Sequence, residues 1–75
     1  MLDKTFQFVV DLQCHLVTGE IDTLFNFKVS VKARAIREAR DDLHSVATEM
    51  VHDDGGNLLD APLDFLEVLN IREEP

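Results

Sequence analysis

The 75-residue chain has one cysteine, few basic residues and no long hydrophobic run. Cys14 has no second cysteine to pair with, and its position in an apolar row favours an inert buried thiol over a reactive one. No apolar run approaches the roughly 20 residues that span a membrane. The start of the chain, MLDKTFQF, also lacks the charged and apolar blocks of a signal peptide. These absences lead us to expect a cytoplasmic protein.

The sequence also lacks the common patterns of catalytic and metal sites. It has no glycine-rich phosphate loop, no pair of cysteines and no serine-centred elbow. Cys14 and His15 are neighbours on an expected strand, so their side chains point to opposite faces and cannot form a thiol–imidazole pair. His44 and His52 have no third ligand at a suitable spacing, and the acidic segment around Gly55 lacks the residue order of a calcium loop. We therefore expect no enzyme, no cofactor and no metal site.

Two segments of alternating polarity dominate the first half of the chain. Apolar residues occupy even positions from Phe6 to Leu16 and odd positions from Ile21 to Ala33. Such period-two alternation is typical of strands with one buried face. Residues 5–33 therefore predict a β-hairpin. The residues expected to face inward on its second strand are Ile21, Phe25, Phe27, Val29, Val31 and Ala33.

The turn of this hairpin decides which residues face each other. A two-residue turn at Gly19-Glu20 pairs Phe8 with Val31, and a turn at Thr18-Gly19 gives a second register with the same matching of faces. A three-residue loop without a bulge would put the apolar row of one strand against the polar row of the other. We therefore expect a loop of two or four residues, with Gly19 at a positive φ.

Residues 35–52 predict a helix. Their apolar positions recur at spacings that draw a single stripe along about four helical turns. Ala35 stands where a capping Ser or Thr is usual, and Glu38 occupies the matching acidic position three residues later. Gly55-Gly56 are expected to end the helix. The stripe consists of Ile36, Ala39, Leu43, Val46, Ala47, Met50 and Val51.

The tail of the chain predicts a third strand at residues 67–73, with Leu69 and Ile71 facing inward and Val68 facing outward. An amphipathic helix over residues 63–70 is the competing interpretation. A hairpin, a helix and a third strand pack as one α+β domain, a β-β-α-β two-layer sandwich. A right-handed crossover places the third strand beside the first. The predicted fold is a three-stranded antiparallel sheet of order 2-1-3 with one helix on one face.

Charge is unevenly distributed along the chain, whose net charge is −8. Residues 28–40 hold five bases against one acid, residues 41–75 hold ten acids against one base, and residues 1–27 carry a balance of −3. Bulk acidity disfavours direct binding to nucleic acid. Charged helix faces are often only solvated, but an acidic one can also engage a basic groove on another protein. The candidate partner-binding acids are Glu38, Asp41, Asp42, Glu49, Asp53 and Asp54.

Two other surfaces give alternative interpretations. The basic segment would suit a weak nucleic-acid-binding regulator, although no aromatic residue is interleaved with its bases for stacking. Apolar residues expected on the sheet face away from the helix would suit a homodimer or a structural subunit. The basic segment comprises Lys28, Lys32, Arg34, Arg37 and Arg40. The sheet-face candidates are Val9, Val17 and Leu24.

The joint between the second strand and the helix, V-S-V-K-A-R-A-I-R-E-A at residues 29–39, resembles that of small phage and mobile-element proteins with a β-β-α-β layout. Short length, acidity and the lack of a catalytic pattern are also similar to phage-encoded anti-CRISPR and anti-restriction proteins. The resemblance covers layout and composition, so it assigns no functional residue. It implies a small inhibitor that imitates the charge of nucleic acid and binds a host protein or ribonucleoprotein complex through a basic groove.

Overall fold

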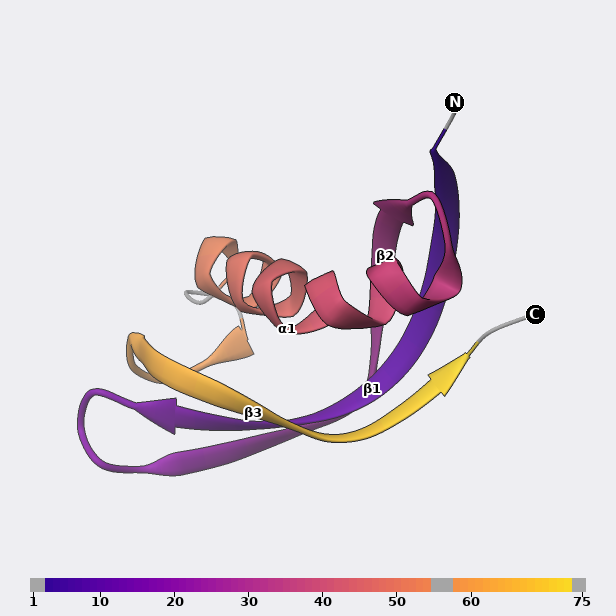
Figure 1. Cartoon of the computed structure of the whole chain (residues 1–75). Coiled ribbons are helices and arrows are strands. Elements are labelled where there is room, and N and C mark those ends of the chain that lie inside the picture. The colour runs from indigo at the N-terminus through magenta and orange to yellow at the C-terminus, as the bar shows by residue number, and fades with distance from the viewer. Residues whose placement is uncertain (1–2, 55–57, 74–75) are drawn as a thin grey trace.

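The computed structural model describes residues 3–54 and 58–73, which form a three-stranded antiparallel sheet and one helix (Figure 1). The sheet order is β2-β1-β3, so the predicted α+β fold, the strand order and the strand in the tail are confirmed. β1 is central because the crossover through α1 returns the chain to the free side of β1. In chain order the elements are β1 (Lys4–Leu16), β2 (Ile21–Ala33), α1 (Ile36–Asp53) and β3 (Leu63–Glu73).

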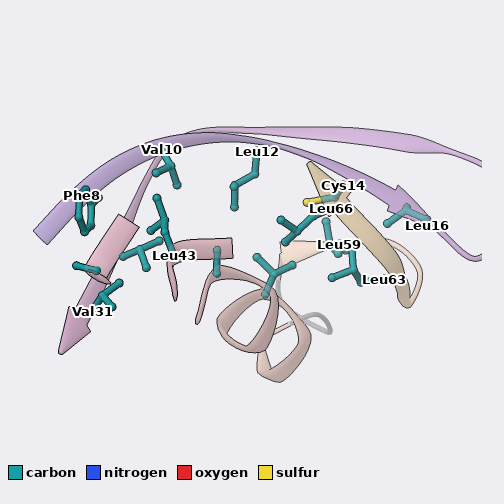
Figure 2. Close-up of a cluster of buried hydrophobic side chains, with 14 of the residues drawn as sticks. Phe8, Val10, Leu12, Cys14, Leu16, Val31, Leu43, Leu59, Leu63 and Leu66 are labelled. Carbon is teal, nitrogen blue, oxygen red and sulfur yellow. The ribbon is translucent and has the colours of Figure 1, made fainter. Parts of the chain in front are cut away.

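The hydrophobic core lies between α1 and the concave side of the sheet. Figure 1 shows the strands curving around α1, and Figure 2 shows apolar side chains of β1 and β3 gathered with Leu43 of the helix. The helix contributes buried residues at spacings of four, as expected for one stripe: Ala39, Leu43, Ala47 and Val51. The even residues of β1 form the other wall: Phe8, Val10, Leu12, Cys14 and Leu16.

The end of α1 lies at Asp53, and the backbone N–H of Asp54 donates a hydrogen bond to the carbonyl of Met50 at 3.1 Å. Gly55 and Gly56, which were predicted to end the helix, lie outside the described residues. Within residues 3–54 and 58–73, no helix has both the length and the apolar character needed to cross a membrane.

The start of α1 lacks a side-chain cap. Ala35 has the extended backbone of a capping residue, with φ −142° and ψ 157°, but its methyl group accepts no hydrogen bond. Glu38 is already at the third helical position, so Ala35→Ser would complete a capping box. We expect Ala35→Ser to raise the free energy of unfolding by about 1 kcal/mol. Urea unfolding followed by circular dichroism measures the change, and an unchanged midpoint would contradict this start of the helix.

Four residues, 17–20, separate β1 from β2, which is one of the two expected loop lengths. Hydrogen bonding continues to Glu20, however, so the closed turn contains three residues, 17–19. The N–H of Leu16 donates to the carbonyl of Glu20 at 2.9 Å, and the N–H of Gly19 donates to the carbonyl of Leu16 at 2.9 Å. Gly19 has the predicted positive φ, 91°, which glycine adopts without steric cost. Farther along the hairpin, Phe8 pairs with Val29, the second of the two expected registers.

A β-bulge in β2 offsets the odd number of residues in the closed turn. Val10 pairs with Phe27, but the next inward residue of β1, Leu12, pairs with Leu24. β2 therefore has two residues between these pairs where β1 has one. The second of the two, Asn26, has a φ of 56°, a left-handed conformation that asparagine tolerates better than most residues. Either irregularity alone would misalign the apolar rows, whereas the two together preserve the core.

The bulge reverses which residues of β2 face the core between it and the loop. Ile21 and Phe25, predicted to face inward, are 54% and 71% exposed. Leu24, predicted to lie on the outer sheet face, packs against the core instead. These three predictions are wrong because a one-residue shift exchanges the two faces of a strand. On the other side of the bulge the predicted row holds, with Val29, Val31 and Ala33 buried.

Strand β3 starts at Leu63, four residues before its predicted start, and it is irregular. Its register against β1 shifts twice, which breaks the strict alternation expected in the tail. Val68 packs against the core and Leu69 is 53% exposed, so both are on the side opposite to the prediction. Ile71 packs against the core, as predicted.

Candidate functional site

The first candidate site is the acidic surface of α1, which we call the acidic helix surface. The spacing of its five helical members places them off the buried stripe, and its sixth member directly follows the last helical residue. All six are exposed, and they extend along about 24 Å of helix axis from the first member to the last. The acidic helix surface consists of Glu38, Asp41, Asp42, Glu49, Asp53 and Asp54.

None of the six carboxylates of the acidic helix surface forms an ion pair with another described residue. The ion pairs within residues 3–54 and 58–73 join Arg40 to Glu73, Arg72 to Asp11 and, if protonated, His15 to Glu67. The acidic helix surface therefore presents carboxylates without ion-pair partners among the described residues on an element anchored by the core, and Arg37 lies one helical turn before Asp41. Such an arrangement attracts cationic groups and speeds encounter with a basic partner.

The five residues of the basic segment do not share one surface. Lys28 and Lys32 are on the outer side of β2, paired across from Val9 and Thr5 of β1. Arg34 and Arg37 are exposed at the entrance to α1. Nη2 of Arg40 donates to Oε1 of Glu73 at 2.7 Å, which joins α1 to the end of β3. The sheet therefore separates the two lysines from the helical arginines.

The second candidate site is the side of the sheet away from α1, which we call the open face. Among the sheet-face candidates, Val9 is half-buried there between Lys28 and Arg72, and Val17 is exposed in the loop next to it. The bulges add exposed apolar residues that sequence reasoning missed: Ile21, Phe25, Phe65 and Leu69. One sequence signal could have revealed that Ile21 and Phe25 of β2 are exposed. It is the triplet Leu-Phe-Asn, in which two apolar residues precede a residue type that accepts a positive φ.

An apolar row crosses the open face at its loop end. His15 of β1 pairs with Ile21 of β2 and with Phe65 of β3. The rings of His15 and Phe65 are stacked, with centroids 4.2 Å apart and planes inclined by 9°. Nε2 of His15 is 3.6 Å from Oε1 of Glu67. The pair presents one continuous aromatic surface to the outside.

A polar cluster ties the three strands together at the bulge. A carboxylate oxygen of Asp11 accepts a hydrogen bond from the backbone N–H of Asn26 at 3.0 Å. Nη2 of Arg72 donates to the side-chain oxygen of Asn26 at 2.5 Å and lies 3.5 Å from the carboxylate of Asp11. The three residues come from β1, β2 and β3, so the cluster holds the bulge in place from both neighbouring strands.

The cysteine and the histidines lie apart from one another. Cys14 faces the core and His15 faces the open side, as predicted. Burial, with a smaller contribution from the carboxylate of Asp22, raises the pKa of the Cys14 thiol, so the thiolate that reacts is disfavoured. Nε2 of His44 donates to the carbonyl oxygen of Leu66 at 2.8 Å. This bond connects α1 to β3, which lies at one edge of the sheet.

The arrangement supports binding through charge on α1 and through apolar contact on the open face. In the part of the chain that the structure describes, no three His, Cys, Asp or Glu side chains are grouped so that they could hold a metal ion. Comparison with models of protein families found no match, and comparisons with curated proteins and with solved structures found none either.

Proposed function

We propose that this chain is a small, non-catalytic protein-binding module that acts in the cytoplasm as an inhibitor. In this proposal the acidic helix surface engages a basic groove on a host protein or ribonucleoprotein complex that handles nucleic acid. The observation that carries the proposal is the group of exposed carboxylates on α1 and at its end, none of which is ion-paired to another described residue. The resemblance in layout and composition to anti-CRISPR and anti-restriction proteins points to the same class of partner.

The physical argument is electrostatic complementarity. A groove that binds phosphates presents arginine and lysine side chains, and these lose favourable contacts when the nucleic acid is absent. Carboxylates held on a rigid helix can replace the phosphates, and little conformational entropy is lost because the core already fixes the helix. Opposite fields also steer the two molecules together, which makes the encounter fast at low ionic strength and slow at high ionic strength.

The proposal predicts salt-sensitive capture of a partner. A tagged chain incubated with host lysate at low salt should retain a nucleic-acid-handling protein or complex, and both high salt and heparin should release it. We expect the triple variant Asp41→Asn, Asp42→Asn, Glu49→Gln to bind that partner at least about tenfold more weakly, because three attractive contacts are lost. The matched control removes three exposed charges elsewhere on the chain: Glu20→Gln, Asp64→Asn and Glu67→Gln.

The control should retain the partner nearly as well as the parent chain. Equal losses in the two triple variants would show that net charge, and not the acidic helix surface, governs binding. Capture that survives both high salt and heparin would also count against the proposal, since a contact made of exposed ion pairs is screened by salt.

A further inference from the structure

We propose that the open face is a contact surface for a second copy of this chain. In the resulting symmetric dimer the two sheets pack back to back and both α1 helices lie on the outside. This inference is independent of the proposed function, because the dimer leaves the acidic helix surface of each copy free. It depends on three observations: where the exposed apolar side chains gather, how the charge is distributed, and how the sheet edges are protected.

Exposed apolar side chains gather at the open face and its loop end. Of the seven large hydrophobic side chains that are exposed in the described residues, only Ile36 and Leu58 lie elsewhere. Single exposed apolar residues are ordinary, whereas a group on one sheet face indicates an interface. The remaining five are Val17, Ile21, Phe25, Phe65 and Leu69.

The distribution of charge along the open face favours a second copy as the occupant. Its charged residues in the described region are Lys28, Lys32 and Arg72 against Asp11 and Glu67, a balance of +1. The whole chain carries −8, so the remainder of the molecule carries −9. Two open faces of +1 each repel only weakly. With the two β1 strands antiparallel, the basic end of one face, at Lys28 on the row of Val9, approaches the loop end of the other, which carries Glu20. A strongly basic partner would be drawn to α1 instead.

The edges of the sheet are poorly suited to adding another strand. β2 carries a bulge and two outward lysines along its edge, both of which oppose edge-to-edge pairing. β3 has two register shifts, and His44 already occupies the carbonyl of Leu66. Association through the open face avoids these obstacles, since it needs no free backbone groups.

We place the two-fold axis in the plane between the two sheets, running across the strands at the level of Gln13. In a two-fold symmetric interface, if one residue of the first copy contacts a second residue of the other copy, the reverse contact is also formed. Gln13 lies midway between the row of Ile21 and Phe65 and the region of Phe25 and Leu69. With the two β1 strands antiparallel, the apolar residues on one side of Gln13 cover those on the other side in the second copy.

Sedimentation equilibrium tests the dimer. We expect the parent chain to reach the mass of two chains, twice 8.5 kDa, as concentration rises. Phe25→Glu should weaken self-association by about a hundredfold, because each dimer loses two buried rings. The control Ile36→Glu makes the same change at an exposed site on α1 and should dimerise like the parent. A parent chain that stays monomeric, or equal effects of the two variants, would overturn the proposal.

Cross-linking tests the position of the axis. Gln13→Cys should be joined to its own copy by a short bismaleimide, since residues on a two-fold axis meet each other. Ser30→Cys, which lies on the outer side of β2 beyond the bulge, should give much less product. The parent chain should give none because Cys14 is buried. Preferential cross-linking through Ser30→Cys would indicate pairing of β2 edges and would overturn the face-to-face arrangement.

Discussion

Phe8→Ala is expected to lower the free energy of unfolding by about 3–5 kcal/mol, whereas Phe25→Ala should change it by less than about 0.5 kcal/mol. Phe8 is fully buried against α1, and Phe25 is 71% exposed because the bulge turns it outward. A domain of this size has only about 4–11 kcal/mol of stability. Phe8→Ala should therefore be largely or partly unfolded under conditions in which Phe25→Ala is native.

Urea unfolding followed by circular dichroism measures both changes, at concentrations low enough for the chain to be monomeric. The comparison is sharp because the two substitutions delete the same side chain from neighbouring strands. Uninterrupted alternation along β2 would place Phe25 in the core. A large loss of stability in Phe25→Ala would therefore contradict the bulge and restore the simple hairpin.

Asn26→Val is expected to cost about 2–3 kcal/mol, and Asn26→Gly only about 1 kcal/mol. The backbone of Asn26 has a φ of 56°, which a β-branched residue adopts at a high steric cost and glycine at almost none. Both variants lose the hydrogen bond from Arg72, so the difference between them isolates the backbone term. We expect the same order in thermal unfolding, with Asn26→Val melting first.

The control for this pair is Arg72→Met, which removes the hydrogen bond to Asn26 and the exposed contact with Asp11 but leaves the backbone of residue 26 unchanged. Its cost should be similar to that of Asn26→Gly. If Asn26→Val were as stable as Asn26→Gly, residue 26 would not require a left-handed backbone, and the bulge would be placed wrongly.

The order of the strands and the position of the helix could be predicted from the sequence because they depend on long periodic patterns. The even apolar residues of β1 continue without interruption from Phe8 to Leu16, and all of them are buried. The stripe of α1 is equally regular. Such patterns average over many residues, so no single exception changes the prediction.

The facing of β2 near the loop could not be predicted from periodicity, because it depends on one residue. The three-residue turn at 17–19 and the bulge at Asn26 each shift the strand by one position, and their effects cancel only beyond the bulge. Periodicity alone therefore assigns Ile21 and Phe25 to the wrong face. The irregular register of β3 has the same consequence for Val68 and Leu69.

The two candidate surfaces also differed in how far they could be predicted from the sequence. The exposure of the acidic helix surface follows from the position of the apolar stripe alone, so its residues could be selected in advance. The open face depends on the bulges, and of the three residues predicted for it, Leu24 belongs to the core. Its aromatic part, the stack of His15 on Phe65, joins residues far apart in the sequence.

The central position of β1 also has a consequence for synthesis of the protein. Of the four elements, β1 leaves the ribosome first, yet one of its two neighbours, β3, leaves it last. Until β3 emerges, half of the backbone groups of β1 that bond between strands have no partner, and Leu63 and Leu66 are missing from beneath the helix. The nascent chain therefore stays partly open, and accessible to chaperones and proteases, until β3 has left the ribosome.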